Sequence, residues 1–216
     1  MKNKSDTFEI FKQFKTIVEN YFKLKIRAIY SDNSGEYIKM ASFLSDNGIS
    51  HFLTPPHTPQ HNGFAERRHR HIVETGLTLL HHASMPLKFW THAFQCAVYL
   101  INRQPTSTLQ FRSPFLALLK GNPNYKKLRV FGCLCFPWLT PYNTSKLEPK
   151  SKPCVFLGYC TQQSAYKCLD PKTNRIYISR HVTFDETTFP FSTTNNSNTV
   201  SFDVQSWLTN PAGTEI

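Results

Sequence analysis

KIRAIYSD, at residues 25–32, is the stretch that decides the fold class of the amino-terminal half. Its residues alternate in polarity, which predicts a half-buried strand, and Ser31-Asp32 ends the run. A helical spacing of apolar residues precedes it at residues 7–22, where Asp6 and Glu9 resemble a capping box. A second helix over residues 35–45 and a short strand over residues 49–54 follow. This order indicates an α/β arrangement.

The carboxyl-terminal half has a different pattern of predicted elements. Beyond a Pro/Asn/Gly turn, helices are predicted at residues 65–83, from Pro86 to Ile101, and from Pro114 to about Gly121. Short strands are then predicted at residues 129–137, 153–159, 165–169 and 175–184. Four short strands in succession predict a small barrel or sheet.

The sequence therefore predicts three regions. Residues 1–120 form an α/β domain, and residues 125–190 form a small basic all-β domain that we expect to fold independently. Residues 191–216 are rich in Ser, Thr and Asn and are predicted to be a flexible tail.

The positive charge is concentrated in one part of the chain. The 216 residues carry a net charge of +11, and residues 120–180 hold eleven Lys or Arg against two Asp or Glu. Residues 181–216 hold four acidic residues and no Lys or Arg. A basic block of this density suits a polyanion such as nucleic acid. The alternative is a surface that only keeps the protein soluble.

Several classes of protein are disfavoured. The six cysteines form no CxxC pair, and no Cys/His set has zinc-finger spacing, so we expect no zinc. No secretory signal and no apolar run of membrane-spanning length is present. We expect an intracellular protein with reduced, packed cysteines and no membrane partner.

Two carboxylates stand where metal-dependent chemistry would need them. Asp32 lies at the carboxyl end of a predicted strand, a usual place for ligand-binding groups in α/β sheets. Glu66 lies in the first turn of a long predicted helix. If strand and helix pack together, both carboxylates converge on a hard cation such as Mg²⁺, which prefers oxygen ligands. Alternatively, Asp32 is a turn residue and Glu66 a first-turn glutamate favoured by the helix dipole.

The sequence motifs around these two carboxylates resemble those of a known family. IYSDNSGEY (residues 29–37) and TPPHTPQHNGFAERRHRHIVE (residues 54–74) are similar to the second and third catalytic motifs of a retroviral-type integrase core, of the Copia class of long-terminal-repeat retrotransposons. The resemblance covers nearly the whole chain to about Phe191. It continues through FWTHAFQCAVYLINRQP (89–105), LRVFGCLCF (128–136) and KLEPKSKPCVFLGY (146–159).

The resemblance implies an RNase H-like core with a catalytic Asp, Asp, Glu set, followed by a Src-homology-3-like barrel. Asp32 matches the second Asp and Glu66 matches the Glu. The first Asp belongs to a strand upstream of the helix at residues 7–22. The expected fold is therefore a truncated integrase core, with its first three strands missing, plus the barrel. Whether the chain is an enzyme stays open, and we expect it to be inactive alone.

The resemblance also implies a chemistry and partners. Asp32 and Glu66 would each hold one Mg²⁺ (or Mn²⁺) for 3′-end processing and strand transfer by phosphoryl displacement. The partners would be the element's DNA ends and target DNA, with a homo-oligomer in the complete enzyme and action in the nucleus. A non-catalytic nucleic-acid-binding remnant of a mobile element is the alternative. An interaction module without DNA contact is a third reading, which the charge block disfavours.

Further residues are predicted to contact DNA. Three arginines follow Glu66 on its helix and would contact phosphates, unless they form a solvated helix face. Two polar residues before Glu66 would shape the loop or touch DNA. The helix and loop residues are Arg67, Arg68, Arg70, Gln60 and Asn62, and the barrel's phosphate-binding face would comprise Lys146, Lys150, Lys152, Lys167, Lys172, Arg175 and Arg180.

Overall fold

The structure, a computed structural model, describes residues 6–53 and 63–192. The chain divides into two compact units, Met1–His69 and Arg70–Ile216, and each is described by itself. The sequence analysis placed a limit between residues 120 and 125 instead. The physical reason for the difference is a hydrophobic core that helices before residue 120 share with the later strands.

The first unit holds three helices and a parallel strand pair. Its elements are α1 (Thr7–Phe22), β1 (Ala28–Ser31), α2 (Gly35–Ile38), α3 (Ala41–Asp46) and β2 (Ser50–Leu53). The predicted helix and both strands are confirmed. The helix predicted over residues 35–45 is two short helices, because Met40 N–H bonds to the Tyr37 carbonyl three residues back and tightens the turn. The predicted capping box is not formed, because the Asp6 side chain makes no capping hydrogen bond.

A small core holds the first unit together. Met40, Leu44 and Ile49 are buried, and Phe8 of α1 packs its ring edge against Phe43, 5.3 Å between ring centres. α1 has no fully buried residue. This core is small for five elements, so the unit relies on few apolar contacts.

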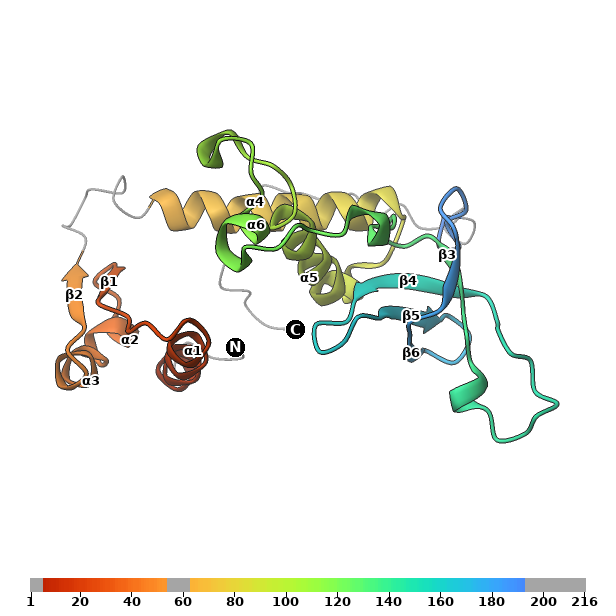
Figure 1. Cartoon of the computed structure of the whole chain (residues 1–216), viewed down its shortest axis with the longest axis horizontal. Helices are drawn as coiled ribbons and strands as arrows, with labels where there is room; N and C mark the ends of the chain where they lie inside the picture. Colours follow the sequence, from red (N-terminus) through yellow and green to blue (C-terminus); the bar gives the residue numbers. More distant parts are fainter. Residues whose placement is uncertain (1–5, 54–62, 193–216) are drawn as a thin grey trace. The chain divides into compact units, whose positions relative to one another are not determined.

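The second unit begins inside a long helix and continues into an antiparallel sheet (Figure 1). The helices predicted around residues 65–83, 86–101 and from Pro114 are confirmed, the second with a short 3₁₀ turn at Leu87–Phe89 before it. The elements are α4 (Gly63–His82), α5 (Trp90–Ile101), α6 (Pro114–Leu119), β3 (Leu134–Pro137), β4 (Cys154–Tyr159), β5 (Tyr166–Asp170), β6 (Arg175–Ser179) and β7 (Val182–Asp185).

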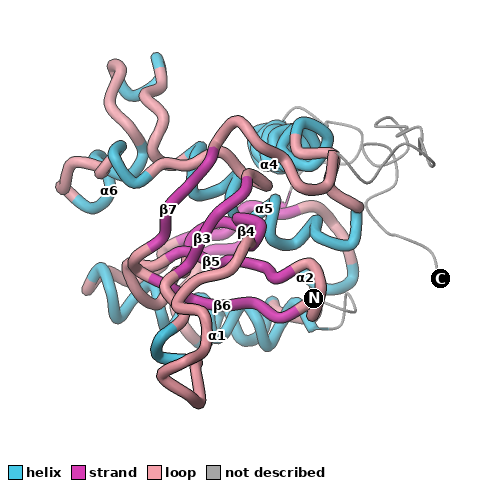
Figure 2. Tube along the Cα trace, turned by 90° about the vertical axis from the view of Figure 1, so that its right-hand side faces the viewer, coloured by secondary structure: helices cyan, strands magenta, loops and turns pink. Residues whose placement is uncertain are grey.

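The sheet order shows that the strands curl into a barrel. The order is β6-β5-β4-β3-β7, so β6 and β7 occupy opposite ends. Only Arg180 and His181 join them, hence the two edges must lie close together. A hydrogen bond of 2.9 Å from Trp138 N–H to the His181 carbonyl extends the β3–β7 pairing. Ser179 Oγ, at the end of β6, donates to the Trp138 carbonyl at 3.4 Å, and Figure 2 shows the curled strands. The single strand predicted over residues 175–184 is therefore wrong, because the chain crosses there to the far edge.

α5 packs on β4 and joins the barrel core (Figure 1). Gly158, with φ of +110°, lies at a register shift in β4, and a Cβ there would lie 3.4 Å from Cys96 Cβ of α5. That distance is an ordinary van der Waals contact, so glycine is favoured here by the positive φ of the backbone at the register shift. Buried Ala93 and Phe89 line the same core as Phe156 of β4. The helical and barrel parts of the second unit thus share one core.

The six cysteines are free, and all but Cys160 are buried. Burial raises the pKa of the Cys96 and Cys154 thiols to about 12, so they stay protonated and unreactive. They act as packing residues. Within the described residues, no helix is both long and apolar enough to cross a membrane.

Candidate carboxylate pair and nucleic-acid interface

Asp32 directly follows β1 and is exposed. Its Oδ1 accepts hydrogen bonds from Ser34 N (3.2 Å) and Ser34 Oγ (2.7 Å). These bonds fix the orientation of the carboxylate, and no bond to another described residue involves Oδ2. Asp32 is therefore both a turn residue and an exposed carboxylate whose Oδ2 has no hydrogen bond to a described residue.

The parallel pairing of β1 with β2 defines the edge on which Asp32 lies. Ser31 pairs in register with Leu53, so both strands end at this edge. Ser31 Oγ lies 2.8 Å from His51 Nε2 of β2. This hydrogen bond ties the strands together one residue before Asp32. The sequence analysis did not single out His51, and an isolated histidine in a strand gives no signal for such a role.

Glu66 lies in the first turn of α4 and is exposed. It makes no hydrogen bond or ion pair with another described residue. Arg67, Arg68 and Arg70 follow it, also exposed, and the Arg68 guanidinium lies 5.3 Å from the Phe64 ring centre. The carboxylate thus stands in a strongly basic helical turn, where the arginines have no carboxylate partner among the described residues.

The predicted residues Gln60 and Asn62 lie outside the described residues. No contact between Asp32 and Glu66 is defined, so their convergence stays a prediction. Within the parts of the chain that are described, no group of three or more His, Cys, Asp or Glu side chains could hold a metal ion.

Lys152 has a different environment from the one expected of a phosphate-binding lysine. Its ammonium donates to Asp170 Oδ2 at 2.6 Å and to the Tyr177 hydroxyl at 2.8 Å, and only 33% of its side chain is exposed. The hydrogen bond from Lys152 holds the pKa of Asp170 far below its usual range, and the same bond raises the pKa of Lys152. This lysine is committed to an internal ion pair.

Asp170→Ala is expected to lower the free energy of unfolding by about 3 kcal/mol at pH 7, because it leaves the partly buried Lys152 ammonium without its carboxylate partner. The value is at the low end for broken buried pairs because Lys152 keeps some contact with water. Denaturant unfolding followed by circular dichroism measures it.

The pH dependence provides the control. Asp170 has a depressed pKa in the folded state, so its contribution is present above the ordinary carboxyl pKa of 3.8 and is lost as pH falls through the folded value. The difference between wild type and variant should therefore shrink below about pH 4. A difference independent of pH would contradict this assignment.

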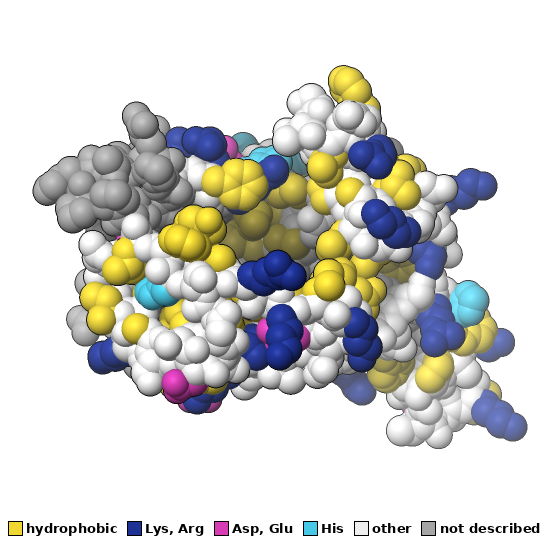
Figure 3. Space-filling model, turned by 60° about the vertical axis from the view of Figure 1, so that its left-hand side comes forward, with side chains coloured by type: hydrophobic (Ala, Val, Ile, Leu, Met, Phe, Trp, Pro, Cys, Tyr) yellow, Lys and Arg dark blue, Asp and Glu magenta, His cyan; other side chains and the backbone are white. Residues whose placement is uncertain are grey.

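The other basic residues of the barrel fall into two groups. Lys146, Lys150 and Lys172 are exposed. Lys167 Nζ donates to Gln95 Oε1 of α5 at 3.0 Å, and the Arg175 guanidinium lies 5.0 Å from the Tyr177 ring centre. Figure 3 shows that Lys and Arg side chains far outnumber acidic ones on one face of the molecule. The exposed lysines remain available to a polyanion.

Comparison with known proteins gives a family match for the strand region of the second unit. Residues 133–198 match the family described as the retroviral polymerase SH3-like domain. The barrel is therefore a retroviral polymerase SH3-like domain, as its motifs indicated.

The wider chain resembles plant retrotransposon polyproteins. The retrovirus-related Pol polyproteins from transposons RE2 and RE1 of Arabidopsis thaliana are 60% and 59% identical to it, over 90% and 89% of its length. The Pol polyprotein from transposon TNT 1-94 of Nicotiana tabacum is 39% identical over 86% of the chain. The chain is thus a homologue of Copia-type retrovirus-related Pol polyproteins, which confirms the resemblance. It spans only 13% of the length of the RE2 and RE1 polyproteins and 14% of the TNT 1-94 polyprotein.

A solved structure shows a weak likeness. It is the simian T-cell lymphotropic virus intasome in complex with the PP2A regulatory subunit B56 gamma. The TM-score is 0.39 and the sequence identity 14%, over 78% of this chain and 60% of the matched chain.

Proposed function

We propose that this chain corresponds to part of a retrotransposon integrase, which serves DNA integration in the full-length protein and binds nucleic acid through its own surface. The observation that carries the proposal is the position of Asp32. It lies at the carboxyl edge of the parallel pair β1–β2, with one carboxylate oxygen held by Ser34. The chain leaves β2 at the same edge before it reaches Glu66.

In this proposal the first unit is part of an RNase H-like core. Asp32 and Glu66 are its catalytic carboxylates and serve as ligands of Mg²⁺ or Mn²⁺. Their oxygens suit such hard cations, and neither carboxylate is engaged in an ion pair with a described residue. When bound, the metal would promote in-line phosphoryl displacement. Asp32 contributes an oriented oxygen, and Glu66 an exposed one next to arginines that can position phosphates.

Two separate groups of basic residues are proposed to bind nucleic acid. Arg67, Arg68 and Arg70 extend along one exposed helical segment, and Lys146 and Lys150 are exposed on the SH3-like domain. Gln60 and Asn62, which lie outside the described residues, are proposed to contribute as well. The partners are the element's DNA ends and target DNA, the complete enzyme is proposed to be a homo-oligomer, and its site of action is the nucleus.

Salt dependence tests the nucleic-acid part of the proposal. Binding of the full chain to duplex DNA is expected to weaken steeply with salt, by about 0.9 in log affinity per log salt for each phosphate contacted. It should differ little between unrelated duplexes, because phosphate contacts carry no sequence information. Fluorescence anisotropy at several salt concentrations measures both.

Charge reversal locates the surface. Lys146→Glu with Lys150→Glu is expected to reduce the salt slope by about two, whereas the matched reversal Lys23→Glu with Lys25→Glu, of equal net charge, should change it far less. Lys152 is omitted because it is bound to Asp170. A flat salt response of the wild-type chain would contradict nucleic-acid binding itself.

A further inference from the structure

Two aromatic side chains project from the outer face of β3 and its end. Phe136 and Trp138 are 36% and 45% exposed, while Pro137 and Leu139 are buried in the barrel. The alternation follows from the period of two along a strand, which sends successive side chains to opposite faces. Large aromatic side chains left side by side in water indicate a binding surface more strongly than scattered ones do.

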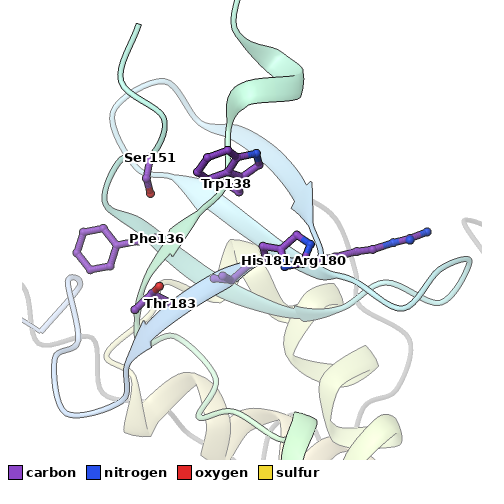
Figure 4. A pocket seen from close by; sticks show the side chains of 7 residues that line it. Phe136, Trp138, Ser151, Arg180, His181 and Thr183 are labelled. Atoms are coloured by element: carbon purple, nitrogen blue, oxygen red, sulfur yellow. The ribbon is translucent and has the colours of Figure 1, made fainter.

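Phe136 and Trp138 belong to an open groove of about 590 Å³. The rest of its lining comes from the segment Arg180–Thr183 and from Ser151. Figure 4 shows Phe136 and Arg180 at opposite ends of the groove, with the rings of Trp138 and His181 between them. The Lys150 ammonium lies 5.9 Å from the centre of a Trp138 ring. No Asp or Glu is among the described residues that line the groove.

The groove is held in place by hydrogen bonds to the backbone segments that carry its side chains. Ser179 Oγ donates to the His181 carbonyl at 2.9 Å and to the Trp138 carbonyl at 3.4 Å. Leu139 N–H donates to the Lys150 carbonyl at 2.8 Å. The backbone that carries the indole and the backbone that carries the cations are therefore fixed before any ligand arrives, which lowers the entropic cost of binding.

We propose that this groove binds an unpaired nucleotide of a single-stranded nucleic acid. The base would stack on Trp138, and the flanking phosphates would lie near Lys150 and Arg180. Aromatic rings beside cations are the arrangement that single-stranded nucleic acids use, because every base has a face that can stack. In a duplex those faces are already stacked, so the indole gains little from duplex DNA. The proposal rests on the proposed nucleic-acid function and adds the strand form and the residues.

A proline-rich peptide is the other ligand that an aromatic groove can take. The charge of the groove argues for the nucleic acid. Lys150 and Arg180 supply positive charge, and no described acidic side chain lines the surface. The positive charge attracts a polyanion to the groove, whereas it adds no electrostatic attraction for an uncharged peptide.

The test uses the full chain and a fluorescein-labelled 15-nucleotide oligothymidylate, with a 15-base-pair duplex for comparison. Trp138→Ala is expected to weaken oligothymidylate binding about tenfold or more, and to change duplex binding by less than about twofold. Trp138→Phe keeps a stacking ring and should retain most of the affinity. Trp90→Ala is the matched control, because Trp90 is 44% exposed and lies on α5, outside the groove.

The outcomes separate this inference from the proposed function. Equal oligothymidylate affinity of wild type and Trp138→Ala overturns the groove but leaves nucleic-acid binding standing. A wild-type chain that binds neither strand form overturns the proposed function. If Trp138→Ala fails to fold by circular dichroism, Arg180→Ala decides, since Arg180 is exposed: unchanged oligothymidylate binding overturns the inference. Quenching of Trp138 fluorescence by decaproline and not by oligothymidylate also overturns it.

Discussion

Residues 63–192 are expected to unfold in a cooperative transition, and residues 125–192, expressed without α4 and α5, are expected to lose it. The reason is the shared core of the second unit. Leu80, Met85, Phe89, Ala93 and Cys96 come from before residue 120 and are buried against the strands. A fully buried large apolar side chain contributes about 1.5–3 kcal/mol, so the loss of Leu80, Met85 and Phe89 alone would remove about 5–9 kcal/mol. That is comparable to the net stability of a small domain.

Thermal unfolding followed by circular dichroism compares the two fragments directly. A point variant in the full chain provides an independent test of the same interface. Ala93→Asp places a charge in the buried face of α5, whereas Val98→Asp places it on the same helix at a residue that is 38% exposed. We expect a loss above about 3 kcal/mol for the first and less than about 1 kcal/mol for the second. Equal, sharp transitions for residues 63–192 and 125–192 would show that the barrel folds without the helices.

This expectation departs from the sequence analysis, which predicted independent folding of residues 125–190. The apolar face of the helix at residues 90–101 was visible as a period of 3.6 residues. Periodicity shows that a face is buried but does not identify what covers it. The face is covered by β4, which lies more than fifty residues later in the chain, and the register shift of β4 at Gly158 is a tertiary feature.

The same limit explains the break between β6 and β7. The two residues between β6 and β7 are Arg180 and His181. Neither is a Gly or Pro that would indicate a turn, so residues 175–184 show one continuous strand pattern. The chain passes there from pairing with β5 to pairing with β3, which supplies Trp138 N–H as a partner for the His181 carbonyl. Elements whose ends are marked by capping or helix-breaking residues were predictable, such as α6, which begins at Pro114 directly after Ser113. There Ser113 Oγ accepts the Leu116 N–H bond that caps the helix.

The positions of the candidate site residues were predictable where they follow from the ends of local elements. Asp32 follows its strand and Glu66 opens its helix, as their local sequence indicated. Lys152 was assigned to a phosphate-binding face by its charge alone, and its partner Asp170 comes 18 residues later in the chain. Trp138 was not singled out. The run Phe-Pro-Trp-Leu at residues 136–139 held a signal, because alternation in a strand places both rings on the outer face once Pro137 and Leu139 are inside.

Asp32→Asn and Glu66→Gln are each expected to reduce DNA joining by about 1,000-fold when this chain replaces the matching segment of a full-length Copia-type polyprotein, a loss of about 4 kcal/mol of transition-state stabilisation. The RE2 polyprotein offers a suitable host because its matching segment is 60% identical. Both substitutions keep the shape of the side chain and remove the negative charge that a cation requires. Asp46→Asn, at an exposed residue at the end of α3, is the matched control and should join DNA at the wild-type rate.

The isolated chain provides the complementary measurement. We expect it to join no oligonucleotide end to plasmid DNA with Mg²⁺ or Mn²⁺, since the proposed site uses Asp32 and Glu66 and the resemblance implies a set of three carboxylates. Joining by the isolated chain that disappears with Asp32→Asn would show that two carboxylates suffice. A wild-type chimera that binds DNA but joins none, at normal expression, would instead favour a non-catalytic nucleic-acid-binding remnant. Joining by the Asp32→Asn and Glu66→Gln chimeras at the wild-type rate would remove both residues from the catalytic site, because a metal-dependent transfer cannot lose an essential ligand without loss of rate.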